Sequence, residues 1–151
     1  MIVIRDFEKK DSIEDLLEIL KEVWSLNEIS ESTLDRWFKN NNHMVVAELD
    51  GKIIGSATLH LQQKIIRNGG IAGFIEDVVV KESHRGNNIG TQLIQELIKK
   101  AENFGCYKVI LSCFPERINF YKKNGFIQES ITMRFNFKDS IPTTNISDNM
   151  S

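Results

Sequence analysis

The residues with the most evident chemistry lie between positions 75 and 91. An apolar strand that carries two adjacent carboxylates, Glu76 and Asp77, is followed by a turn of small and polar residues at 85–90 and then by a helical pattern. A strand that runs through such a turn into a helix N-terminus gathers backbone N–H groups, which bind the pyrophosphate of a nucleotide-like cofactor. The turn lacks both Gly-Lys-Ser/Thr and Gly-x-Gly-x-x-Gly, so the Walker A and Rossmann sites are disfavoured.

The elements that must position these residues follow from the apolar spacing, which predicts the order β, α, α, three strands, α, β, α, β. The expected strands are at 2–5, 44–49, 53–61, 71–80, 107–113 and 126–137, and the expected helices at 13–24, 34–38, 89–104 and 118–123. Ser12 and Asp15 are spaced for a capping box, and Asp50-Gly51 predicts a hairpin with a primed turn. We therefore expect an α/β fold, with a mixed sheet covered by helices on both faces.

Length and composition limit the function classes. The chain has 151 residues, of which 41% are hydrophobic, and a net charge of −2. These values indicate one domain, at 1–137, followed by a mobile polar tail at 138–151. A general nucleic-acid binder would carry a basic excess, which is absent. Cys106 and Cys113 lie on one predicted strand with their side chains on opposite faces, so we expect free thiols and a cytoplasmic location.

A downstream segment makes the cofactor site more specific: Asn119-Phe120-Tyr121-Lys122-Lys123-Asn124-Gly125-Phe126. With the strand and the turn, this segment resembles the GNAT superfamily of N-acetyltransferases, in which the three parts together hold acetyl-coenzyme A. Within the superfamily the chain is most similar to the glucosamine 6-phosphate N-acetyltransferases, at 64–67, Gly73, 75–78, 105–111 and 120–121. The resemblance is strong from about residue 62 to 127 and weak before residue 45.

The resemblance implies the GNAT fold and a reaction. An acetyl group passes directly from acetyl-coenzyme A to the amine of glucosamine 6-phosphate in a ternary complex, without a metal, on the route to UDP-N-acetylglucosamine. It also implies a homodimer, in which the C-terminal strand packs on the partner and both chains complete the sugar site. Neither a membrane nor a nucleic acid is an expected partner.

The resemblance also implies a role for each matching residue. The implied catalytic residues are Tyr121, which hydrogen-bonds the departing sulfur, Glu76 and Asp77, which hold the sugar, and Val78, whose N–H stabilises the oxyanion. The implied coenzyme-binding residues are Val78, Val80, Arg85, Gly86, Asn87, Asn88, Ile89, Gly90, Thr91, Ser112, Arg117 and Tyr121. The implied substrate-binding residues are Lys64, Ile65, Ile66, Arg67, Glu76, Asp77, Tyr107 and Lys108.

Several readings stay open. Glu76 and Asp77 could form a surface bulge, Tyr121 could be a core aromatic residue, and the cations at 64 and 67 could be solvated loop charges. The chain departs from the family pattern at Phe74, Asn88, Ser112, Arg117 and Asn136. The alternatives are therefore a GNAT enzyme for another small amine or a protein amine, and a coenzyme A binding module without catalysis.

Overall fold

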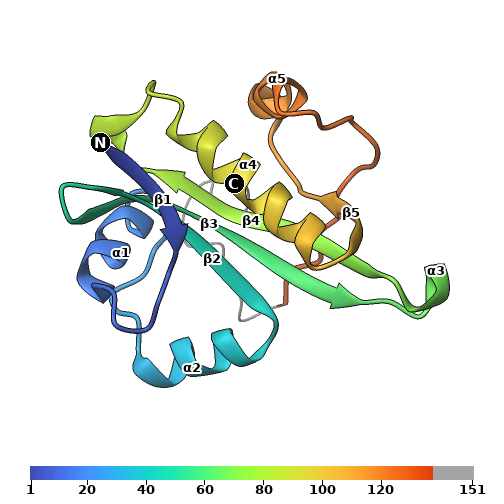
Figure 1. Cartoon of the computed structure of the whole chain (residues 1–151), viewed down its shortest axis with the longest axis horizontal. Coiled ribbons are helices and arrows are strands. Elements are labelled where there is room, and N and C mark those ends of the chain that lie inside the picture. Colours follow the sequence, from blue (N-terminus) through green and yellow to red (C-terminus); the bar gives the residue numbers. More distant parts are fainter. Residues whose placement is uncertain (138–151) are drawn as a thin grey trace.

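A computed structural model describes residues 1–137, so the tail expected at 138–151 lies outside the described residues. Five strands and five helices follow one another in it (Figure 1). The strands are β1 (Ile2–Asp6), β2 (Asn42–Leu49), β3 (Lys52–Gln63), β4 (Ile71–Val80) and β5 (Cys106–Ile110). The helices are α1 (Ile13–Leu20), α2 (Glu31–Lys39), α3 (Ile66–Gly69), α4 (Ile89–Asn103) and α5 (Ile118–Lys123), with 3₁₀ turns at Glu82–His84 and Pro115–Arg117.

The strands form one mixed sheet in the order β1-β2-β3-β4-β5. The first four strands are antiparallel neighbours, and β5 pairs with β4 in parallel. Asp50 and Gly51 connect β2 to β3 with φ values of 50° and 79°, as a primed hairpin turn requires. The predicted hairpin, mixed sheet and fold class are therefore confirmed.

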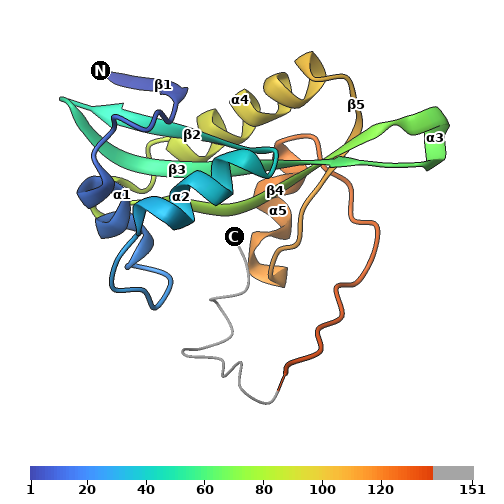
Figure 2. The same ribbon diagram turned by 90° about the horizontal axis from the view of Figure 1, so that it is seen from below.

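The sheet separates two apolar clusters, because alternate residues of its central strands face opposite sides. Val45 and Ala47 pack with α4 on one side, and Val46 packs with Leu16 and Ile19 of α1 on the other. Figure 2 shows α4 above the sheet, with α1 and α2 below it. The expectation of helices on both faces is confirmed.

The helix starts differ in how their free N–H groups are satisfied. Ser12 and Ser30 cap α1 and α2 by accepting hydrogen bonds from the N–H groups three residues later. The predicted capping box forms only in part, because the Asp15 carboxylate accepts the N–H of Ile53 on β3. In the described part of the chain, the side chain of Asn88, the N-cap of α4, makes no capping hydrogen bond. The first-turn N–H groups of α4 therefore stay available to an anion.

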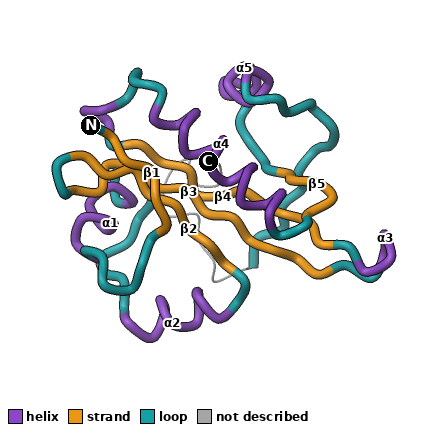
Figure 3. The backbone as a smooth tube through the Cα atoms, viewed as in Figure 1, coloured by secondary structure: helices purple, strands orange, loops and turns teal. Residues whose placement is uncertain are grey.

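Two predicted strands differ from the structure. The strand expected at 107–113 is β5, which ends at Ile110, so Cys113 lies beyond the sheet; both cysteines are free, as expected. The strand expected at 126–137 is wrong for the isolated chain, because these residues form no strand (Figure 3). After Phe126, which is half-buried, the large apolar side chains are exposed, namely Ile127, Ile131, Met133, Phe135 and Phe137. Period-two spacing predicted a strand, but a strand forms only where another strand pairs with it.

The connection between the strands expected at 53–61 and 71–80 is a short arm. The β3–β4 hairpin projects from the body of the molecule and ends in the single turn α3 (Figure 2). Arg67 and Asn68 both have left-handed backbone angles there, with φ of 57° and 54°. Within residues 1–137, no helix is long and apolar enough to cross a membrane.

Candidate functional site

The centre of the candidate site is a β-bulge on β4. Glu76 faces Thr58 and Val79 faces Ser56, so Asp77 and Val78 together stand opposite the single residue Ala57. Asp77 has a φ of 54°, the left-handed angle of the first residue in one common bulge type. Such a bulge leaves backbone N–H groups unpaired with the neighbouring strand and changes the direction of the side chains. It therefore sets the position of the Val78 N–H and of the two carboxylates.

The two carboxylates share this bulge without burial in the core. Both residues are exposed, so they lie in a surface bulge, one of the alternatives left open by the sequence. Desolvation by the neighbouring protein, together with the Glu76 charge, raises the pKa of Asp77 to about 6. At neutral pH Asp77 is therefore mainly ionised but can still take up a proton.

β4 and β5 stop pairing before the bulge. The parallel register ends with Phe74 against Ile110, while β4 continues to Val80. The β5 side of the bulge therefore has no strand partner among the described residues. Val78 and Val80 pack there against the apolar cluster that contains Ile89 and Tyr121. The half of β4 that contains the bulge thus has one strand edge whose backbone groups can pair with an extended ligand.

The turn before α4 has the geometry of an anion-binding loop. Gly86 has a φ of 89° and Asn88, the N-cap of α4, has a φ of 60°. These two left-handed residues bring the chain round to the uncapped N-terminus of α4. Gly90 fits closely, since a Cβ atom there would stand 3.3 Å from the Phe120 ring. Residues Gly86, Asn87 and Asn88 are exposed, whereas Gly90 and Thr91 are half-buried.

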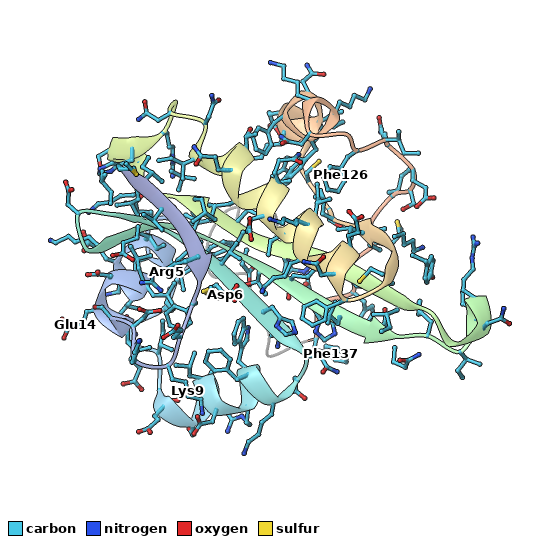
Figure 4. The ribbon with its side chains drawn as sticks, in the orientation of Figure 1. Arg5, Asp6, Lys9, Glu14, Phe126 and Phe137 are labelled. Carbon is cyan, nitrogen blue, oxygen red and sulfur yellow. The ribbon has the colours of Figure 1, made fainter. Side chains whose placement is uncertain are left out.

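Tyr121 comes to this turn from α5. It is 3% exposed and packs edge-on against Phe120 and Phe126, with ring centroids 5.0 and 5.7 Å away (Phe126 is labelled in Figure 4). Burial raises the pKa of Tyr121 to about 12, while the Arg117 charge opposes the rise. The hydroxyl group is thus protonated at neutral pH and can donate a hydrogen bond.

The other two residues expected near the coenzyme lie on the connection after β5. Arg117 is exposed and precedes the first residue of α5, four positions before Tyr121. The Arg117 charge also acts on Cys113. Burial raises the pKa of the Cys113 thiol above its ordinary value, and the Arg117 charge opposes part of this rise. Ser112 is exposed, and its hydroxyl group pairs with that of Thr132 at 2.6 Å. The Ser112 hydroxyl group is therefore hydrogen-bonded to the segment that follows α5.

A separate set of cations lies around Tyr107, where the end of the β3–β4 arm meets the start of β5. The Arg67 guanidinium stands 5.3 Å from the centroid of the Tyr107 ring, and the Lys108 ammonium stands 5.6 Å from it. Gly70 leaves room for that ring, since a Cβ atom there would be 2.8 Å from it. Lys64 is half-buried, whereas Ile65 and Ile66 are 96% and 63% exposed. Of the residues expected to bind the substrate at 64–67 and 107–108, Arg67, Tyr107 and Lys108 thus lie together.

Most of the described chain matches a family of known enzymes. The model of the Acetyltransferase (GNAT) family matches residues 11–126. The chain belongs to the GNAT acetyltransferase family. It is 33% identical to the glucosamine 6-phosphate N-acetyltransferase of Arabidopsis thaliana, over 86% of this chain and 93% of that protein. The resemblance found in the sequence is confirmed.

Solved structures show the same fold. An acetyltransferase of Trypanosoma brucei has a TM-score of 0.86 at 33% identity, covering 91% of this chain and 100% of that chain. A predicted acetyltransferase with acetyl-CoA from Clostridium acetobutylicum has a TM-score of 0.70 at 25% identity, covering 90% of this chain and 96% of that chain. The five-stranded mixed sheet is therefore the GNAT fold.

The GNAT fold brings together some of the predicted site residues and separates others. The bulge, the turn before α4 and Tyr121 meet around one apolar cluster, which holds Val78, Val80, Ile89 and Phe120. The cations gather instead where β5 begins. Lys108 pairs with Ala72, and Asp77 is five residues further along β4, or roughly 16 Å at ~3.3 Å per residue.

Sequence reasoning missed several residues that support the site. Asn124 is buried and joins α4 to α5 by accepting a hydrogen bond from Gln95 and donating one to the Phe120 carbonyl. Glu22, after α1, contacts the start of the turn that precedes α4. No local pattern marks it, because its partners are about sixty residues away in the sequence. In residues 1–137, no three His, Cys, Asp or Glu residues are grouped to hold a metal.

Proposed function

We propose that this GNAT protein transfers the acetyl group of acetyl-coenzyme A to the amine of glucosamine 6-phosphate. The observation that carries the choice of acceptor is the Tyr107 ring, flanked by the Arg67 and Lys108 cations. Two cations fixed by an aromatic ring suit a phosphate dianion, which accepts several charge-assisted hydrogen bonds. The name of the Arabidopsis relative supports the same acceptor.

In this proposal the turn and the bulge divide the work. The free N–H groups at the start of α4 hold the coenzyme pyrophosphate, next to Gly86 and Asn88. Asp77, ionised at neutral pH, orients the sugar amine and accepts its proton. The N–H of Val78 donates to the oxygen that becomes negative when the C–N bond forms.

Tyr121 acts on the leaving group. As the C–S bond breaks, sulfur takes the electron pair, and the Tyr121 hydroxyl donates a hydrogen bond to the thiolate. A pKa of about 12 keeps that hydroxyl protonated in the resting protein. Its two aromatic neighbours hold the ring in place, which agrees with a fixed donor as well as with a packing role. Only kinetics separates these two roles.

We propose further that two chains share each sugar site. The phosphate cations are held at Tyr107, apart from Glu76 and Asp77 of their own chain. The projecting arm and the exposed apolar segment 127–137 supply a surface that a second chain can cover. The alternating side chains of that segment suit a strand that pairs with the partner. The protein would then be a homodimer.

Two measurements test the proposal. Thiol release should be at least about a hundredfold more efficient with glucosamine 6-phosphate than with glucosamine, because several charge-assisted bonds hold the phosphate. Activity on polyamines or peptides alone would favour another GNAT acceptor. Coenzyme binding without transfer to any amine would favour a module without catalysis.

Subunit complementation tests the shared site. Tyr121→Phe and Arg67→Ala homodimers should each be nearly inactive. Random mixed dimers should recover about one-quarter of the wild-type rate, because half of the dimers are mixed and one of their two sites is intact. Recovery should need joint refolding, which allows exchange of chains. No recovery in a mixture that contains heterodimers would place the whole site within one chain.

A further inference from the structure

The turn that follows α1 contacts the connection between β4 and α4. One Glu22 carboxylate oxygen accepts a hydrogen bond from the backbone N–H of Glu82 at 2.8 Å. The same oxygen lies 3.6 Å from a terminal nitrogen of Arg85. The Glu22 side chain is only 25% exposed, so protein covers most of it. One carboxylate therefore holds both a main-chain group and a cation at the entrance to the pyrophosphate turn.

Arg85 is held from a second direction. Its Nε donates to the Val80 carbonyl at 2.9 Å, which joins it to the last residue of β4. The Nε–H group makes a hydrogen bond, whereas the 3.6 Å contact with Glu22 is an ion pair. Because the Arg85 side chain is 49% exposed, its terminal N–H groups remain available to an anion from solution.

A second contact from α1 fixes the residue before Glu82. Glu18 and Lys81 form an ion pair at 2.9 Å. Glu18 and Glu22 are four residues apart, so both reach the same side of the chain as it leaves α1. Residues 81, 82 and 85 are thus tethered to α1, whereas Gly86 and Asn88, which follow directly, have left-handed backbone angles.

We propose that Glu22 is a positioning residue for acetyl-coenzyme A: it holds Arg85 and the Glu82 N–H so that the pyrophosphate turn stands preformed. This inference rests on the proposed coenzyme site. It makes a prediction of definite sign. A carboxylate that merely lay near the anionic coenzyme would repel it, and its removal would tighten binding. A positioning carboxylate lowers the ordering cost of the turn, and its removal weakens binding.

The test is calorimetric titration of acetyl-coenzyme A into the full chain and its variants. Glu22→Ala should raise Kd about tenfold, and Glu22→Gln, which keeps an acceptor for the Glu82 N–H, about threefold. The matched control is Glu14→Ala, an exposed carboxylate on α1 (Figure 4), which should leave Kd within about twofold. Unchanged or tighter binding by Glu22→Ala would overturn the proposal.

Two further readouts separate positioning from general destabilisation. In steady state, Glu22→Ala should raise KM for acetyl-coenzyme A and leave kcat and the KM for the amine unchanged. In an Arg85→Ala background, Glu22→Ala should add only about threefold instead of tenfold, because its action through Arg85 is already lost and only the contact with the Glu82 N–H remains. Full additivity would contradict that route. If the wild-type chain binds no coenzyme, the proposed function fails instead, so the two failures are distinct.

Discussion

Replacement of Asp77 by asparagine gives a direct test of the proposed chemistry. The pKa of Asp77 is raised to about 6 by desolvation and by the Glu76 charge. About one-tenth of the molecules therefore carry this carboxylate at pH 5 and about nine-tenths at pH 7. If the carboxylate receives the amine proton, kcat/KM of the wild type should fall about tenfold per pH unit below 6. Asparagine adopts the left-handed angle of Asp77 (φ 54°) readily, so Asp77→Asn isolates the charge.

The assay is initial thiol release between pH 5 and pH 8. A substrate phosphate also titrates near pH 6, so the profile should be repeated with glucosamine 6-sulfate, whose sulfate group keeps its charge over this range, with rates expressed per free amine. Asp77→Asn should be roughly a hundredfold slower at pH 7.5 and should lose the acid limb. Glu76→Gln should shift the limb to lower pH, because it removes one cause of the raised pKa. An unchanged limb in Asp77→Asn with the sulfate substrate would refute the assignment.

The same group has a predicted effect on stability. The folded pKa of Asp77, about 6, lies above the ordinary value of 3.8. Its contribution therefore favours the folded state below about pH 3.8, and is lost as pH rises through 6. Asp77→Asn should accordingly raise Tm more at pH 7.5 than at pH 4.5. Thermal unfolding at the two pH values measures this difference, and an equal shift at both would contradict the raised pKa.

Four further predictions concern single positions. Gly90→Val should raise the Kd for acetyl-coenzyme A at least tenfold, or about 1.4 kcal/mol, because its Cβ would crowd Phe120; unchanged affinity in calorimetry would remove the turn from the coenzyme site. Tyr121→Phe should lower kcat roughly ten- to a thousandfold with little change in KM for acetyl-coenzyme A. An undiminished kcat would make Tyr121 a packing residue. Arg67→Ala should erode the preference for glucosamine 6-phosphate over glucosamine, and the ratio of the two kcat/KM values measures it; a constant ratio would exclude Arg67 from the phosphate site. Ser56→Ala should raise the free energy of unfolding by about 1 kcal/mol in urea titrations, because the Ser56 hydroxyl is buried and lacks a hydrogen-bond partner among the described residues; a loss of stability would point to a bound water.

Much of the fold could be predicted because local signals agreed with it. Asp50-Gly51 specified the β2–β3 hairpin, and the apolar spacing from Ile89 to Ala101 specified α4. The segment 126–137 could not be predicted in the same way. The alternation of apolar and polar residues in this segment can be read from the sequence, but strand pairing depends on which strand edge is available. In the described chain the segment pairs with no edge of the sheet.

The candidate site was predictable where its parts are continuous in sequence, as in the bulge at Glu76–Val78 and the turn at 85–91. It was not predictable where side chains meet across the fold. Asp15 was expected to complete a local capping box, yet its carboxylate accepts the N–H of Ile53. Glu22 gave no signal at all, because its partners are brought near only when α1 packs against the sheet.

Backbone strain in this chain is concentrated at the segments with proposed functions. Of the six described non-glycine residues with left-handed angles, Asn41 and Asp50 lie in connecting turns, and the other four are Arg67, Asn68, Asp77 and Asn88. Asparagine and aspartate tolerate this angle, but arginine has no such local reason, and each strained residue costs roughly 1–3 kcal/mol. Glycine at position 67 would adopt this angle without strain, but it would not supply a guanidinium group. Arginine at this position therefore makes most sense if the cation beside Tyr107 has a binding role that outweighs the strain.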